Sequence, residues 1–95
     1  MIERHITFNV NPDAADRFEA FFTDEYRPAM AESAGFIRAD LLREADQPLR
    51  YQMVFRFENA EAAAGWRTSE VHQALQPALT ALFTGNEIVG YEVIA

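Results

Sequence analysis

The spacing of hydrophobic and polar residues changes along the chain, and each change of period predicts a new element. Residues 4–10 (RHITFNV) have period two, with Ile6, Phe8 and Val10 on one side. Neighbouring side chains of a β-strand point to opposite faces, so this segment predicts a first strand with one apolar face. From Ala14 onward apolar residues recur at every fourth position, which predicts a helix.

The first predicted helix is bounded by residues that favour turns. Asn11 is a suitable N-cap, and Pro12 fits the first helical position. One apolar stripe runs along the helix, formed by Phe18, Phe22, Tyr26 and Met30. Pro28 lies within this stripe and lacks a backbone N–H, so it predicts a kink or a helix end near Tyr26. Gly35 suits a left-handed exit from the helix.

Two further alternating segments, 36–44 and 50–58, predict a β-hairpin whose turn contains Pro48. One register of this hairpin places Leu41 opposite Met53. A shift by two residues would keep the same side chains on the same faces, so the pattern leaves the register open.

The remainder of the chain predicts a second helical region and a last strand. Asn59 is the expected N-cap of the first part, and Thr68 or Ser69 caps a second part. Apolar residues follow at helical spacing, namely Val71, Leu75, Leu79 and Leu82. Residues 84–86 (TGN) are expected to end this helix. Residues 87–94 (EIVGYEVI) alternate and predict the final strand.

The element order is therefore βαββαβ in a single domain, residues 1–95. It predicts a ferredoxin-like α+β fold, a four-stranded antiparallel sheet with both helical regions on one face. The more apolar side of each strand is expected to face the helices: Ile6, Phe8, Ile37, Leu41, Tyr51, Met53, Phe55, Phe57, Val89 and Tyr91.

The opposite face of the predicted sheet carries both apolar and charged residues. Its expected members are Phe36, Leu42, Val54, Ile88 and Ile94 together with His5, Arg38, Asp40, Arg56 and Glu92. Five apolar side chains on one open surface form a patch that soluble monomers usually avoid. We therefore expect a homodimer through this sheet face, two sheets closing a barrel. The alternative is a solvated face with scattered hydrophobic residues.

Composition narrows the function classes. The chain has 8 basic and 15 acidic residues, a net charge of −7, and no lysine, so binding to nucleic acid is not expected. It has no cysteine, which excludes disulfides and thiolate chemistry. No run of about 20 apolar residues predicts a membrane span, and no secretory signal is apparent, so a cytoplasmic location is expected.

An ordered set of segments resembles the antibiotic biosynthesis monooxygenase family of dimeric α+β-barrel proteins. The segments are F18-E19-A20-F21-F22, G35-F36, Y51-Q52-M53-V54-F55-R56-F57, E61-A62, W66-x-x-S69-x-x-H72 and T84-G85. The resemblance implies a monooxygenase that needs no metal, flavin or haem cofactor. Its substrates would be dioxygen and a small electron-rich aromatic molecule, such as a quinol, an anthrone or a polyketide-type compound. The pocket would lie between the sheet and the helices.

Within that resemblance, three residues are candidates for catalysis. Trp66 would shape the pocket and donate a hydrogen bond, His72 would handle a proton, and Tyr51 would stabilise an oxyanion. Expected substrate-binding residues are Phe22, Tyr26, Met53 and Tyr91.

Each candidate also has a structural reading. Trp66 can be a core residue, His72 can face solvent, and His5 becomes the better base if the two sheet faces are exchanged. His5 and His72 have no spacing typical of a metal site. Two other functions stay open: a non-catalytic dimeric ligand-binding or stress-associated protein, and an isomerase of a small oxygenated metabolite.

Overall fold

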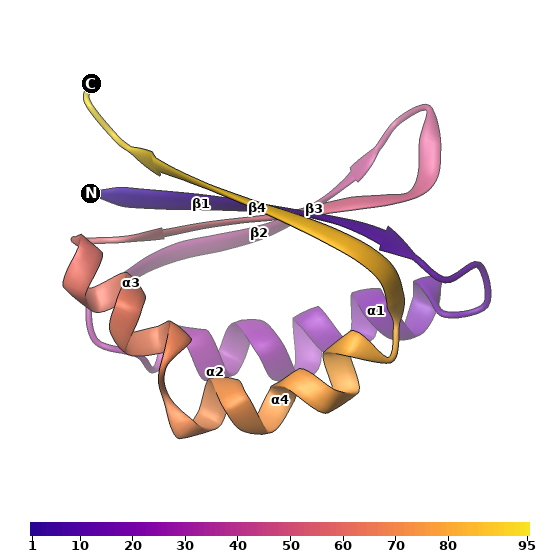
Figure 1. Cartoon of the computed structure of the whole chain (residues 1–95), viewed down its shortest axis with the longest axis horizontal. Coiled ribbons are helices and arrows are strands. Elements are labelled where there is room, and N and C mark those ends of the chain that lie inside the picture. The colour runs from indigo at the N-terminus through magenta and orange to yellow at the C-terminus, as the bar shows by residue number, and fades with distance from the viewer.

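The computed structural model describes residues 1–95 and contains one four-stranded antiparallel sheet, in the order β2-β3-β1-β4. Its elements are β1 (Ile2–Val10), α1 (Ala15–Phe21), the π-helical turn η1 (Phe22–Tyr26), α2 (Arg27–Ala31), β2 (Phe36–Glu44), β3 (Gln47–Phe57), α3 (Ala60–Arg67), α4 (Glu70–Thr80) and β4 (Phe83–Glu92). All helices lie on one side of the sheet (Figure 1), which confirms the predicted ferredoxin-like α+β fold.

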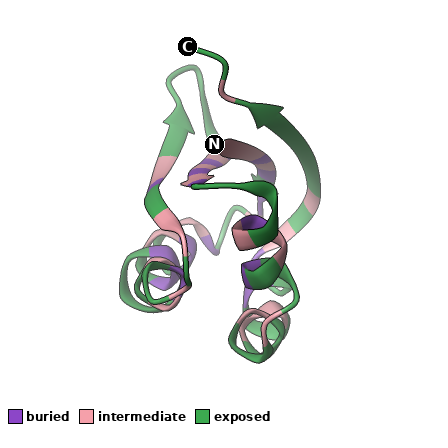
Figure 2. Cartoon of the chain, turned by 90° about the vertical axis from the view of Figure 1, so that its left-hand side faces the viewer, coloured by how far each residue is buried: buried purple, intermediate pink, exposed green.

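The hydrophobic core fills the layer between the sheet and the helices, and the other face of the sheet is open (Figure 2). Aromatic residues dominate the core, and no charged or polar residue is fully buried in it. The largest fully buried side chains are those of Phe8, Phe18, Phe22, Tyr26, Met30, Met53 and Phe57. No helix is long and apolar enough to cross a membrane.

The register suggested for the hairpin is confirmed, since Leu41 pairs with Met53 in the sheet. A β-bulge near the start of β2 overturns one face assignment. The register shifts between Phe36 and Arg38, which places Phe36 opposite Phe57 and packs it against the core instead of on the open face. Ile37 is the extra residue of this bulge and is 41% exposed, so its expected place among the helix-covered residues was also wrong.

The prediction for β4 was wrong in both its bounds and its faces. Residues 84–86 do not end the helix, because they lie inside a strand that begins at Phe83. Val89 pairs with His5, and Tyr91 pairs with Glu3, so both lie on the open face. Directly paired residues share a face, so Ile88 and Glu92, expected on the open face, alternate to the helix-covered side. Ile94 lies beyond the end of the strand and is 92% exposed.

The start of the first helix also differs from the prediction. α1 begins after Ala14, which has no side-chain cap, so Asn11 and Pro12 precede the helix. Asn11 instead links the β1–α1 connection to the α4–β4 connection, because its side-chain amide donates to the Ala81 carbonyl and its backbone N–H donates to the Leu82 carbonyl.

Pro28 neither ends nor interrupts the helical run, which continues to Ala31. It is accommodated by the π-helical turn that precedes it, in which the Arg27 N–H bonds to the Phe22 carbonyl, five residues earlier. A proline donates no backbone hydrogen bond, and a wide turn before it removes the need for one there.

Three local predictions for the turns and caps are confirmed. Gly35 has a φ of +78°, the left-handed conformation that glycine adopts without strain. The Asn59 side chain accepts the Ala62 N–H at 2.8 Å and caps α3. Ser69 caps α4 by accepting the His72 N–H at 3.1 Å. In the stripe predicted for α4, Val71 is 53% exposed and does not contribute to the core.

Candidate active site

A small cavity of about 110 Å³ lies between the sheet and the helices α3 and α4. Its walls combine aliphatic and aromatic residues from β1, β3 and β4 with Tyr26, Trp66, His72 and Gln76 from the helices. The structure therefore brings together three residues singled out in the sequence, namely Tyr26, Trp66 and His72.

The three rings form a compact cluster with edge-to-face geometry. The centroids of Trp66 and His72 are 5.1 Å apart at an interplanar angle of 73°. Tyr26 lies 5.6 Å from Trp66 at 88°, and 6.3 Å from His72 at 64°. Such tilted contacts place the positive edge of one ring against the negative face of another, which stabilises a fixed arrangement.

Two nitrogen atoms in this cluster are buried without a hydrogen-bond partner, Nε1 of Trp66 and Nδ1 of His72. They are the buried side-chain polar atoms of the chain that lack a partner. Leaving a donor or acceptor unpaired costs about 1–3 kcal/mol, so such groups in a cavity wall indicate a place for a polar ligand atom. The other ring nitrogen of His72, Nε2, lies 3.1 Å from the side-chain nitrogen of Gln76.

Burial changes the acid–base properties of the cluster. Desolvation lowers the pKa of His72; the Arg67 charge also lowers it, while the Arg67 backbone carbonyl opposes the shift. His72 is therefore neutral at pH 7. Desolvation raises the pKa of Tyr26 to about 12, so this hydroxyl stays protonated. Trp66 slightly opposes the shift at Tyr26, although its N–H makes no hydrogen bond of normal geometry.

The rim of the cavity carries two arginines, Arg4 from β1 and Arg67 from the end of α3. No aspartate or glutamate lines the cavity. The pKa of Arg4 is lowered, first by burial and then by the charge of Arg67, so the two cations are near each other. Sequence reasoning missed Arg4, Arg67 and Gln76 because nothing in their local spacing distinguishes them from surface residues.

Tyr51 does not join the cavity. Its hydroxyl donates a short hydrogen bond to Glu19, which also pairs with Arg43 at 3.1 Å. These residues line an open groove between η1 and β2, and Phe22 belongs to the same groove. The pKa of Tyr51 is raised, mainly by desolvation and then by the Glu19 carboxylate.

Two expected substrate-binding residues are also placed away from the cavity. Met53 is fully buried in the core, and Tyr91 is on the open face, so neither lines the space beside Trp66. The prediction of Tyr91 failed for the same reason as the assignment of the β4 faces: both sides of this strand carry apolar residues, so alternation alone cannot tell them apart.

Residues 1–78 match the sequence model of the family described as antibiotic biosynthesis monooxygenase. The chain belongs to the antibiotic biosynthesis monooxygenase family. This confirms the resemblance identified from the sequence. The matched residues include α3, which carries Trp66, and most of α4, which carries His72. Comparison with curated protein sequences gives no match.

Solved structures agree with the family assignment. SnoaB from Streptomyces nogalater, a cofactor-independent oxygenase solved as a single-site variant, is 25% identical, with a TM-score of 0.87 over 97% of this chain and 91% of its own. A candidate antibiotic biosynthesis monooxygenase from Deinococcus radiodurans is 18% identical, with a TM-score of 0.89 over 100% and 94% of the two chains. One from Nitrosomonas europaea is 18% identical, with a TM-score of 0.87 over the whole of both chains.

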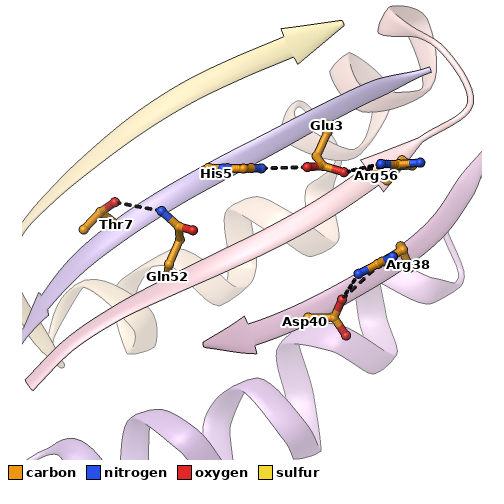
Figure 3. A network of polar contacts seen from close by, with 7 residues as sticks. All are labelled: Glu3, His5, Thr7, Arg38, Asp40, Gln52 and Arg56. Atoms are coloured by element: carbon orange, nitrogen blue, oxygen red, sulfur yellow. Dashed lines mark hydrogen bonds and ion pairs between the residues drawn. The ribbon is translucent and has the colours of Figure 1, made fainter. Parts of the chain in front are cut away.

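On the open face of this family member, His5 belongs to a polar network and not to the cavity (Figure 3). Glu3 accepts hydrogen bonds from His5 at 2.7 Å and from Arg56 at 2.7 and 2.9 Å. Its pKa is lowered, first by His5 and then by Arg56. Tyr91 packs on the His5 ring, with centroids 4.7 Å apart. The exchange of faces that would make His5 the pocket base does not occur.

Proposed function

We propose that the protein is a cofactor-independent monooxygenase acting on a small aromatic quinol, anthrone or polyketide-type substrate. The observation that supports this most strongly is the pair of unpartnered nitrogens, Trp66 Nε1 and His72 Nδ1, in the wall of one cavity. Family membership and the likeness to an oxygenase that needs no cofactor support the reaction class.

In such a reaction the substrate supplies all the electrons. One oxygen atom of O₂ enters the ring carbon, and the other leaves as water with two hydrogens of the substrate. The protein has to accept a proton from the phenol or the acidic carbon, stabilise the oxyanion that remains, and keep water away from the reacting carbon. The buried aromatic wall around Tyr26 and Trp66 serves the last of these needs.

His72 is assigned to the proton and Trp66 to the oxyanion. The lowered pKa of His72 keeps its ring neutral and able to accept a proton at neutral pH. Nδ1 is the accepting atom when Nε2–H is donated to the amide oxygen of Gln76, an orientation reached by turning the amide. Tyr51 takes no part, because its hydroxyl is bound to Glu19 in a different groove.

We also infer that the protein forms a homodimer through the open sheet face. Leu42, Val89 and Tyr91 are 50%, 42% and 48% exposed on this face, which is a large apolar surface for water to cover. Several polar neighbours on this face are already paired with one another, such as Arg38 with Asp40 at 2.7 Å, and this pairing lowers the cost of covering them. Glu87, opposite Thr7, is on the same face and forms no ion pair. Light scattering should give twice the mass of 10.8 kDa, and Val89→Glu should give the single mass.

The function is tested by oxygen uptake with a panel of quinols and anthrones in the absence of any added cofactor. Uptake should be lost in His72→Ala and retained in Arg17→Gln, an arginine of α1 that forms no ion pair and does not line the cavity. No uptake with any substrate would refute the monooxygenase assignment and favour a non-catalytic ligand-binding protein. Conversion of an oxygenated metabolite without O₂ consumption would favour an isomerase.

A further inference from the structure

The cavity differs in charge from the rest of the protein. The chain carries a net charge of −7, yet the cavity is lined by two arginines and by no acidic residue. Four other arginines pair with carboxylates, Arg38, Arg43, Arg50 and Arg56. Arg4 and Arg67 form no ion pair and no side-chain hydrogen bond, although acidic residues outnumber basic ones almost two to one. Arg17 and Arg27 also lack a carboxylate partner, but neither of them lines this cavity.

Two cations close together without a counterion are unfavourable. The lowered pKa of Arg4 reflects this, since burial and the charge of Arg67 both disfavour its protonated form. A negatively charged ligand group at the rim would relieve both effects. Arginine is well suited to this, because its planar guanidinium can bind a carboxylate through two parallel hydrogen bonds.

The interior of the cavity offers hydrogen-bonding atoms but no charge. Trp66 presents an N–H donor, and His72 presents a nitrogen that is neutral at pH 7. These atoms match a hydroxyl group or the oxyanion that forms from it, whereas a permanent carboxylate would lose its solvation there without a cation in contact. The polar groups of a ligand are therefore expected to divide, with the hydroxyl inside and the acid at the rim.

The volume limits the size of the aromatic part. A cavity of about 150 Å³ in another protein holds benzene, so the 110 Å³ here is close to the space that one ring fills. Three fused rings would not fit without displacing wall residues such as Trp66 and Leu79, which are 2% and 3% exposed. Among the substrates proposed above, the volume therefore favours single-ring quinols over anthrones.

We propose that the substrate of this site is a single-ring aromatic acid with hydroxyl groups, a dihydroxybenzoate-like quinol whose carboxylate lies between Arg4 and Arg67. This rests on the proposed function for the identity of the reaction, but the preference for an anion follows from the rim alone. Arg4 and Arg67 determine which quinol is accepted, whereas Trp66 and His72 act on the hydroxyl end.

The test compares the binding of 2,5-dihydroxybenzoate with that of 2,5-dihydroxybenzamide, which has the same shape and no charge. Calorimetric titration without oxygen should give an affinity for the acid about tenfold higher than for the amide, a ratio that falls as salt screens the exposed arginine. In ¹H–¹⁵N NMR spectra the acid should shift the indole N–H peak, which is unique because the chain has one tryptophan.

Arg67→Gln is the decisive variant, because Arg67 is exposed and its loss leaves the core intact. It should remove most of the preference for the acid and leave affinity for the amide unchanged, while Arg17→Gln should change neither. Equal affinities for acid and amide in the parent, or an unchanged ratio in Arg67→Gln, would overturn the proposal. Oxygen uptake with unsubstituted hydroquinone separates the two ideas: uptake without acid preference rejects this inference and retains the monooxygenase.

Discussion

Replacing Trp66 by phenylalanine tests whether the indole N–H is kept for a ligand. Trp66 is 2% exposed, and its N–H has no partner in the folded protein. The substitution removes two buried carbons, which costs about 1.6 kcal/mol at roughly 0.8 kcal/mol for each. It also removes the unpaired donor, which relieves about 1–3 kcal/mol. The free energy of unfolding should therefore stay within about 1.5 kcal/mol of the parent.

A tryptophan whose N–H served the fold would behave differently. Loss of a hydrogen bond would add about 0.5–1.5 kcal/mol to the loss of the carbons, giving a destabilisation of about 2–3 kcal/mol. Urea unfolding followed by far-ultraviolet circular dichroism distinguishes the two cases and does not depend on tryptophan fluorescence. Phe57→Leu is a suitable comparison, because Phe57 is fully buried and removing its ring atoms relieves no unpaired group.

The same variant should lose function while keeping its stability. A hydrogen bond to a charged oxygen contributes about 1.5–3 kcal/mol, so kcat/KM in oxygen uptake should fall by about 10- to 100-fold. Destabilisation above about 2 kcal/mol together with unchanged kcat/KM would refute the reasoning, since it would make Trp66 a core residue and nothing more.

Three further outcomes are expected. Gly35→Ala should destabilise the protein by about 2–4 kcal/mol, because φ is +78° and the new Cβ would lie 2.5 Å from Ala62 Cβ. Gly65→Ala should instead stabilise it by about 0.5–1 kcal/mol, because Gly65 lies inside α3 with open space around it. Thermal unfolding measures both changes. Folding lowers the pKa of His72 below 6.5, so the contribution of His72 to the free energy of unfolding is complete above pH 6.5 and is lost as the pH falls from 6.5 toward the folded pKa. In urea titrations between pH 7 and pH 5, His72→Gln should therefore make the free energy of unfolding fall less steeply with pH. The same steepness in the variant and the parent would contradict this expectation. Gln76→Glu places a carboxylate beside Nε2 of His72, so it should raise the pKa of His72 and move the acidic limb of the activity–pH profile to higher pH. Gln73→Glu is the control: Gln73 lies one helical turn from Gln76 and bonds to Thr68, so this change should leave the acidic limb in place.

Much of the architecture follows from periodicity and caps. The strands β1 and β3 alternate cleanly, and Asn59 and Ser69 cap the helices where a short side-chain oxygen precedes an apolar run. β4 was predicted poorly because both of its faces are largely exposed, so there is little difference in burial for alternation to record. The bulge at Ile37 could not be predicted from the sequence either. One inserted residue moves the preceding residue, Phe36, to the opposite face of the sheet, and the apolar and polar residues of the strand do not show where the insertion lies.

The site residues that could be predicted from the sequence are those of residue types that occur once or twice in the chain, whereas those of a common type could not be told apart from surface residues. Trp66 is the only tryptophan and His72 is one of two histidines, so the sequence alone singles out both, and the helical stripe predicts Tyr26. Arg4 and Arg67 are two of eight arginines, and only the fold shows that they share a rim free of carboxylates. Tyr51 was chosen for its phenol, but the position of Glu19 on the neighbouring helix redirects that hydroxyl.

The π-helical turn contains one residue more than an α-helical turn, and this extra residue keeps Phe18 and Phe22 on the same side of the helical run as Tyr26 and Met30. Deleting one of the exposed residues 23–25 would therefore relax the turn to an α-helical one and leave both pairs of side chains facing the core. The cost would fall on Pro28, which would lose the wide turn that accommodates its ring. A deletion between Phe18 and Phe22, where no wide turn can absorb it, would instead rotate these two rings apart by about 100°. Natural variation in the length of this run is thus expected within residues 23–25, on the outside of the molecule, and not within α1.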